Sequence, residues 1–236
     1  MLASVFIPNR YNAFAWLNIL FLILLICLGK IAPYAVVFGY FLETIIIGLF
    51  NIVKMILASK KDDSGSSIWF LVPFFIFHYG MFVAVQSVFA FVIIGIGGQS
   101  FINEPFDLID NYTKIVSLEG MEYILPLFVI TQLLKLIFDF VLTNKNRAFT
   151  ASEIMTKPYV RIFIQQFVVI LAMFFIMFSE SGVIAAVLLV LFRGVVDFFM
   201  AAIREHEILL DRVVDKIYDG KTSKEKLRKQ LLLFSE

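Results

Sequence analysis

Cysteine and histidine are almost absent from this chain of 236 residues, which has one cysteine and two histidines. The single cysteine, Cys27, excludes an intramolecular disulfide and any metal site built from several cysteines. The two histidines, His78 and His206, are too few for a histidine-rich metal or haem site. We therefore expect neither a metal nor a cofactor.

Charged residues are also scarce, at 17% of the chain, and the net charge is only +1. A soluble domain usually carries about 25% charged residues. The small net charge gives no reason to expect a nucleic acid as a partner. The sequence also lacks a glycine-rich phosphate loop, a serine elbow and a His-Glu-x-x-His helix, so no motif assigns an enzymatic reaction.

Apolar residues dominate instead, with 61% hydrophobic residues, 28 phenylalanines and a mean hydropathy of +0.91. One soluble core of this size cannot bury so much apolar side chain, so the excess must face the lipid bilayer. The sequence therefore predicts an integral membrane protein.

Runs of about 20 mostly apolar residues predict six membrane helices and an all-α, polytopic fold. The six predicted spans are Ala13–Leu28, Ile31–Ala58, Ile68–Gly97, Tyr123–Leu142, Tyr159–Phe178 and Gly182–Ile203. Pro158 is expected to start the fifth helix. We expect a transmembrane domain over residues 1–203, with one long exterior loop at 99–122, and a cytoplasmic helical tail over 204–236.

Basic residues predict the orientation of the helices, because cytoplasmic connections carry an excess of Lys and Arg. If the chain crosses six times, Arg10, Lys60, Lys61, Lys145, Arg147, Lys157, Arg161 and the basic residues from Arg204 onward fall on one side. The opposite side carries mainly acidic residues. We therefore expect both termini in the cytoplasm and a multi-pass protein of the cell (inner) membrane.

Two segments outside the spans have helical patterns. In the exterior loop, Phe106, Ile109, Tyr112 and Val116 recur at helical spacing, which predicts a short helix packed on the outer surface, with a substrate lid as the alternative. In the tail, Thr222 and Glu225 form a predicted capping box ahead of a basic amphipathic turn that contains Leu227, Leu231 and Phe234. This turn could bind anionic lipid, a cytoplasmic partner or the underside of the bundle.

Charged and polar residues inside the spans fall on stripes. These stripes are Glu43, Asn51 and Lys54 on the second span, Gln132, Lys135 and Asp139 on the fourth, and Arg193 and Asp197 on the sixth. Lys135 and Asp139, and likewise Arg193 and Asp197, are four residues apart, so each acid can pair within its own helix. Charges at membrane depth are costly and normally face the protein interior. Glu43 and Arg193 have similar predicted depths near the midplane, so we expect them to form a pair, either as a structural latch or as part of a working site.

Four further polar residues are site candidates. His78, Tyr79 and Gln86 lie on the third span, and Gln165 lies on the fifth. A histidine at membrane depth can carry a proton or bind a ligand, although a hydrogen-bonded packing role is the more common one.

Several stretches resemble an uncharacterised prokaryotic membrane family, catalogued as domain of unknown function six-four-nine-eight. These stretches are "YFLETIIIGLFNIVKM", "PFFIFHYGMF", "KPYVRIFIQQFVVI" and "VVDFFMAAIREH". The resemblance runs from the second predicted span to the end of the sixth, and it implies a six-helix integral membrane protein without implying an activity. Family members often have histidine where this chain has Gln86, Gln165 or Gln166, and Ala201, and these departures argue against histidine–metal chemistry here.

Three functions fit the sequence. The first is a small-molecule or ion transporter that uses the charged site near the midplane, with a homodimer supplying a second half. The second is a membrane-embedded enzyme or a cofactor- or lipid-binding protein, with His78, Tyr79 and Glu43 as acid–base groups. The third is a non-catalytic assembly subunit in which the charges are latches. A polar cavity would favour the transporter, and an apolar lateral groove beside His78 would favour the enzyme or binding protein. A filled core would favour the assembly subunit.

Overall fold

A computed structural model of the chain describes residues 6–9, 11–59, 67–96, 102, 104–159, 162–163, 167, 170, 182–218, 220 and 222–235. All regular secondary structure in these residues is helical, as predicted. The helices are α2 (Ala13–Cys27), α3 (Pro33–Ser59), α4 (Ile68–Ile96), α5 (Leu108–Val116), α6 (Met121–Leu134), α7 (Lys145–Ala148), α9 (Gly182–Glu205), α10 (Glu207–Ile217) and α11 (Lys224–Phe234). A π-helix, η1 (Lys135–Val141), continues α6, and residues 151–159 form a further helix.

Four helices are long and apolar enough to cross a membrane. They cover Pro33–Ala58, Ile68–Gly95, Met121–Val141 and Ala186–Glu205, and they correspond to four of the six predicted spans. The first predicted span forms α2, but α2 has only 15 residues, which is shorter than the about 20 residues of a typical span. The fifth predicted span, 159–178, lies almost entirely outside the described residues.

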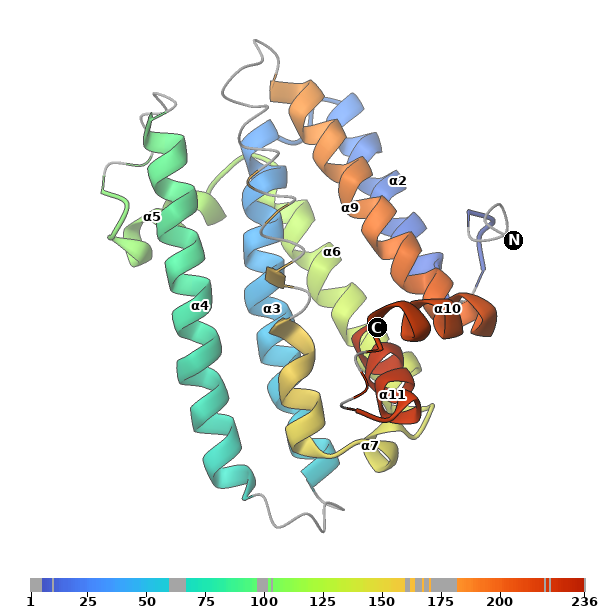
Figure 1. Cartoon of the computed structure of the whole chain (residues 1–236). Helices are drawn as coiled ribbons and strands as arrows, with labels where there is room; N and C mark the ends of the chain where they lie inside the picture. Colours follow the sequence, from blue (N-terminus) through green and yellow to red (C-terminus); the bar gives the residue numbers. More distant parts are fainter. Residues whose placement is uncertain are drawn as a thin grey trace.

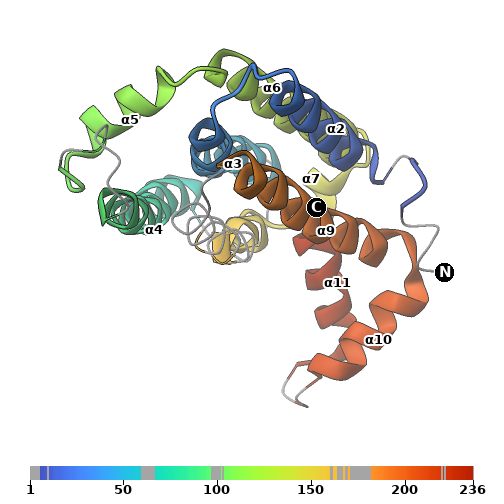
Figure 2. The same ribbon diagram turned by 90° about the horizontal axis from the view of Figure 1, so that it is seen from above.

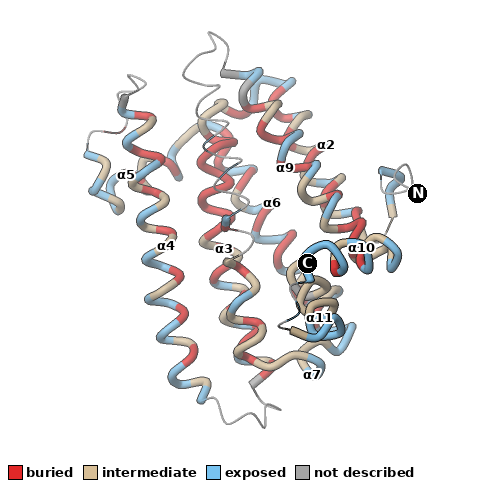
Figure 3. The backbone as a smooth tube through the Cα atoms, viewed as in Figure 1, coloured by how far each residue is buried: buried red, intermediate tan, exposed pale blue. Residues whose placement is uncertain are grey.

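Helix α3 lies in the middle of the bundle. It packs against α4, α6 and α9, and α2 packs against α9 (Figure 2). In its most apolar stretch 67% of residues are buried, compared with 22% for α4 (Figure 3). Helix α4 is therefore a peripheral helix, and its exposed phenylalanines, such as Phe70, Phe77 and Phe89, present apolar surface of the kind that lipid covers.

Glycines allow the close contacts between these helices. A Cβ atom added at each of three glycines would come within about 2.6 Å of a side chain on a neighbouring helix, which no real Cβ atom does. The three contacts are Gly39 with Ile124 of α6, Gly48 with Tyr79 of α4, and Gly194 with Ile19 of α2. Small residues at such contacts are typical of packed membrane helices.

Helices α2 and α4 run towards one end of the bundle and α3, α6 and α9 run towards the other, so the helix termini collect at two ends (Figure 1). We call the end with α7, α10 and α11 the tail end, and the opposite end, which carries α5, the α5 end. The N-terminal segment also lies at the tail end, because Asn9 donates a hydrogen bond to Glu205 (2.9 Å) and Arg204 donates one to the Tyr11 carbonyl (2.8 Å). The two ends of the described chain therefore lie together.

The short helix predicted in the exterior loop forms α5. Asp107 caps its N-terminus by accepting a hydrogen bond from the Asp110 N–H (3.1 Å), and Asn111 and Ile115 are buried. The Tyr112 hydroxyl hydrogen-bonds the Ser87 hydroxyl on α4. These contacts match the packed surface helix rather than a detached lid.

Two predicted helix starts were wrong. The helix before the fifth span begins at residue 151, and Pro158 lies within it. Thr150 and Glu153 form its capping box, with N–H to side-chain distances of 2.9 Å and 3.2 Å. In the tail, Ser223 rather than Thr222 caps α11 by accepting a hydrogen bond from the Lys226 N–H (3.3 Å).

Candidate functional site

The predicted pair between Glu43 and Arg193 is present in the interior of the bundle. An Arg193 Nη2–Glu43 Oε2 contact of 2.6 Å joins α3 to α9. The side chains of Glu43 and Arg193 are only 2% and 8% exposed, so the pair is almost completely removed from solvent. A charged hydrogen bond this short and this buried holds the two helices in one relative position.

Neighbouring side chains complete the network around this pair. Arg193 also contacts Asp197 on its own helix, with a distance of 3.2 Å between Nε and Oδ2, as the four-residue spacing predicted. The Arg193 guanidinium lies 5.0 Å from the centre of the Tyr40 ring, and Gln132 Nε2 lies 3.5 Å from Glu43 Oε1. The geometry is that of a satisfied structural latch.

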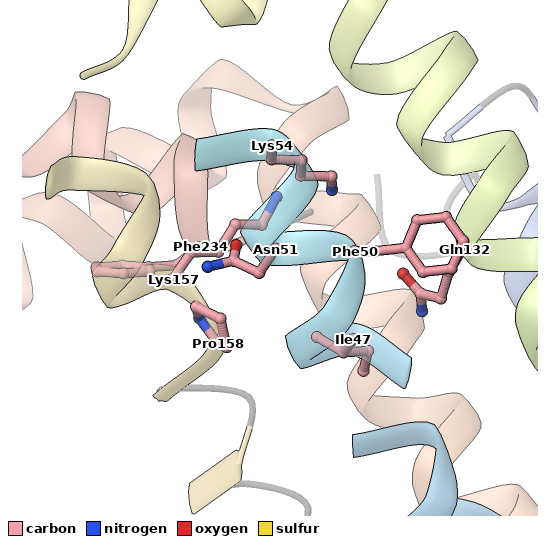
Figure 4. Close-up of a pocket in the computed structure, with 8 residues that line it drawn as sticks. All are labelled: Ile47, Phe50, Asn51, Lys54, Gln132, Lys157, Pro158 and Phe234. Carbon is pink, nitrogen blue, oxygen red and sulfur yellow. The ribbon is translucent and has the colours of Figure 1, made fainter. Parts of the chain in front are cut away.

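A small polar cavity lies beside this network, towards the tail end (Figure 4). Its volume is about 30 Å³, which is room for about one water molecule. Its polar wall consists of Asn51, Lys54, Gln132 and Lys157, and its apolar wall consists of Ile47, Phe50, Pro158 and Phe234. Gln132 belongs to both the cavity and the latch, so the two features are adjacent.

Contacts with neighbouring helices hold the residues of the cavity wall in place. Asn51 on α3 donates a hydrogen bond to the Ile154 carbonyl (3.2 Å), which ties α3 to helix 151–159. Lys54 is buried, and its ammonium lies 5.5 Å from the centre of the Phe140 ring on η1. Phe234 comes from α11, whose Lys229 pairs with Glu153 at 3.1 Å. Helix α11 thus packs on the underside of the bundle and closes the tail side of the cavity.

Basic residues concentrate around the cavity. Burial lowers the pKa of Lys157 well below its usual range, and repulsion from other cations lowers it further; these cations are Lys54, Lys145, Arg204 and Lys135. Burial also lowers the pKa of Lys145 to about 8, against the opposing attraction of Asp139. We call these five residues, Lys54, Lys135, Lys145, Lys157 and Arg204, the basic cluster. Its positive field attracts anions.

Stability should rise with pH because of Lys145. The pKa of lysine in an unfolded chain is about 10.4, so between about pH 8 and 10.4 the unfolded state binds more protons than the folded state. Below about pH 8 Lys145 is protonated in both the folded and the unfolded state, so the cost of burying its charge does not change with pH. We expect the thermal unfolding temperature of the wild type in detergent to increase from pH 7 to pH 9.5. Lys145→Gln should be more stable than the wild type at pH 7, and its unfolding temperature should increase less over the same pH range.

The control for this titration is Lys224→Gln. Lys224 is exposed and pairs with Asp215 at 2.7 Å, which raises its pKa, so its removal should leave the increase intact. An equal loss of the increase in both variants would contradict the role of Lys145.

The other predicted site residues lie in different places. His78 Nδ1 lies 2.8 Å from the Tyr159 hydroxyl, and the Tyr79 hydroxyl donates to the Thr44 carbonyl (2.7 Å). Asp139 pairs with Arg204 at 3.7 Å, and Lys135 belongs to the basic cluster. Gln86 is half-buried on α4, two turns beyond His78. Gln165 lies outside the described residues. The rings of His78 and Tyr79 both contact the Tyr159 ring, at 5.4 Å and 5.8 Å between ring centres, whereas Glu43 is held by Arg193.

Within the described residues, no three His, Cys, Asp or Glu side chains are arranged to hold a metal ion. Cys27 is a free, exposed thiol on α2.

Lys157 and Lys145 were missed as site residues, since the sequence alone placed them in a connection between spans. A signal for Lys157 was present. The pattern Thr150-x-x-Glu153 is a capping box, and it would have started a helix at residue 151 and placed Lys157 on that helix. Nothing comparable indicated Lys145, because α7 has only four residues.

Comparison with known proteins gives a family but no activity. Searches against curated proteins and against solved structures found no match. One family model, described as "Family of unknown function (DUF6498)", matches residues 1–225. This match covers nearly the whole chain and confirms the resemblance seen in the sequence. The chain belongs to the DUF6498 family of unknown function.

Proposed function

We propose that this chain is a six-span protein of the inner membrane, with both ends in the cytoplasm, that binds a small inorganic anion in the polar cavity and carries it across the membrane. The observation that carries the proposal is the cavity itself, with two lysines and two amides in its wall. The side bias of basic residues supports the cytoplasmic position of the tail end.

The chemistry of the wall favours an anion over a cation. Lys54 and Lys157 contribute ammonium groups, and Asn51 and Gln132 contribute amide N–H donors. The cations of the basic cluster repel one another around Lys157, so a bound anion would relieve an unfavourable interaction. Glu43, whose Oε1 lies 3.5 Å from Nε2 of the wall residue Gln132, is held by Arg193.

The location of the cavity supports transport rather than a surface site. Asn51, Lys54 and Gln132 lie on α3 and α6, within two helices of membrane-spanning length and hydropathy. Polar groups at membrane depth often mark the path of an ion or a substrate. Phe234 closes the tail side, so passage requires α11 to move.

A second candidate function is a non-catalytic assembly subunit. The satisfied network of Glu43, Arg193, Asp197 and Gln132 favours it, because these charges serve packing. In that case the cavity would hold a structural water molecule.

Thermal unfolding of the purified chain in nonionic detergent distinguishes these functions. Sodium gluconate, whose anion is too large for the cavity, is replaced at equal ionic strength by sodium chloride. At a concentration of 100 Kd, a bound anion should stabilise the folded state by about 2.7 kcal/mol. Lys54→Gln and Lys157→Gln should each lose this gain, and Lys157→Gln should be more stable than wild type in gluconate because it removes the repulsion.

The matched control is Lys114→Gln, which removes a lysine from α5 at the far end of the bundle and should keep the full anion response. The absence of any gain over gluconate, or equal gains in the wild type and both cavity variants, would overturn the proposal. Proteoliposomes then test transport. Binding without a flux of the same anion would support the assembly subunit instead.

A further inference from the structure

A second, larger cavity lies between α3 and α4 and under α5. It has a volume of about 400 Å³, within the size range of sites that hold small organic molecules. Leu49 and Ile52 of α3, Gly80 and Ala84 of α4, and Leu108 and Tyr112 of α5 are among the residues that line it. We call this cavity the lateral groove. Figure 2 shows α4 and α5 on the same side of α3.

The lateral groove is apolar in its chemistry. Its two hydroxyl groups are engaged: Tyr79 donates to the Thr44 carbonyl (2.7 Å), and Tyr112 bonds to Ser87. The remaining wall is aliphatic or aromatic carbon together with two glycines. Water does not fill apolar cavities, because it finds no hydrogen-bond partners there.

The position of the groove points to a single kind of occupant. Both long walls belong to helices of membrane-spanning length and hydropathy. Leu49 and Ile76 are 58% and 55% exposed, so the groove opens sideways to the medium around the helices, which in a bilayer is hydrocarbon. At one end, α5 lies across the groove and contributes Leu108 and Tyr112 to its wall.

We propose that the lateral groove is a binding site for one acyl chain of a membrane lipid. Tyr79 occupies the groove wall because Gly48 leaves room for its ring, whereas Gly80 has no atom within 4 Å of the place where its Cβ would be. Gly80 is therefore the position at which an added side chain projects into open groove space without a clash. The site is separate from the polar cavity and independent of the anion.

The test uses the full chain in vesicles of phosphatidylethanolamine and phosphatidylglycerol that contain a phosphatidylethanolamine with a photoreactive diazirine near the end of one acyl chain. Adducts are mapped by mass spectrometry after illumination. We expect adducts on groove residues such as Leu49 and Ile76 to exceed those on Phe89, which faces outward on α4, by about tenfold.

Gly80→Phe should fill the groove and lower these adducts about tenfold. The matched control is Gly95→Phe, because Gly95 lies on the same helix, also has open space at its Cβ and does not line the groove. It should leave the adducts unchanged. Leu49→Trp is a second groove-filling variant if Gly80→Phe fails to fold, as judged by size-exclusion chromatography. Equal labelling of groove and outward residues, or equal effects of Gly80→Phe and Gly95→Phe, would overturn the proposal.

Discussion

Replacing Arg193 with glutamine is expected to lower the free energy of unfolding by about 3–5 kcal/mol, because removing one partner of a buried ion pair leaves the other charge in a poor environment. Arg193 lies within 2.6 Å of Glu43 and 3.2 Å of Asp197, so its loss affects two carboxylates. Glu43→Gln should cost less, since Arg193 keeps its contact with Asp197. The measurement is unfolding in detergent, by heat or by titration with a denaturing detergent.

A double-mutant cycle tests whether the two residues act as a pair. Glu43→Gln combined with Arg193→Gln should recover part of the summed loss, with a coupling energy of about 0.5–3 kcal/mol. The control pair is Asp110 and Lys114 on α5, which is exposed and should contribute about 0–1 kcal/mol. Purely additive losses would refute the latch. Unchanged stability with a lost anion response would show instead that Glu43 belongs to the working site.

Gly120→Ala is expected to destabilise the chain by about 2–4 kcal/mol, because it combines backbone strain with a steric clash. Gly120 has a φ of +92°, and an added Cβ would lie 2.7 Å from the Ile31 Cα and 2.8 Å from the Lys30 carbonyl oxygen. These are backbone atoms, which cannot turn away as a side chain can. The substitution would therefore push apart the α2–α3 and α5–α6 connections, which are joined by the Ala32 N–H to Glu119 carbonyl bond (3.1 Å).

Gly29→Ala is the matched control for this change. Gly29 has a φ of +65°, but its Cβ would have no neighbour within 4 Å. It should cost only the strain of the left-handed backbone, about 1–2 kcal/mol. Equal losses in the two variants would show that the clash with Ile31 is relieved at no cost.

The interior charges show how far sequence reasoning reached. The pair of Glu43 and Arg193 followed from counting residues inward along two apolar spans, since depth in a membrane is a one-dimensional property of each helix. The pair of Arg193 and Asp197 followed from the spacing of four residues on one helix. Both pairs are present because an isolated charge in this apolar interior would be costly.

In the fourth predicted span, the directions of the later side chains could not be predicted from the sequence. The prediction that Gln132, Lys135 and Asp139 lie on one stripe assumed that the whole span is a continuous α-helix. The chain instead changes to π-helical i→i+5 bonding at Lys135, which alters the phase of every later side chain. Asp139 meets Arg204 of α9 as a result.

Three properties could be read from the sequence: the helical fold class of the described residues, four helices long and apolar enough to cross a membrane, and the pairing of Glu43 with Arg193. These properties depend on hydropathy and periodicity along single helices. Packing between the helices brings Lys54 and Lys157 into one cavity closed by Phe234, and it leaves a groove open at Gly80 between α3, α4 and α5. Those features depend on the distances between helices far apart in the sequence, which are set by the fit of side chains against glycines and neighbouring helices, and no local pattern encodes that fit.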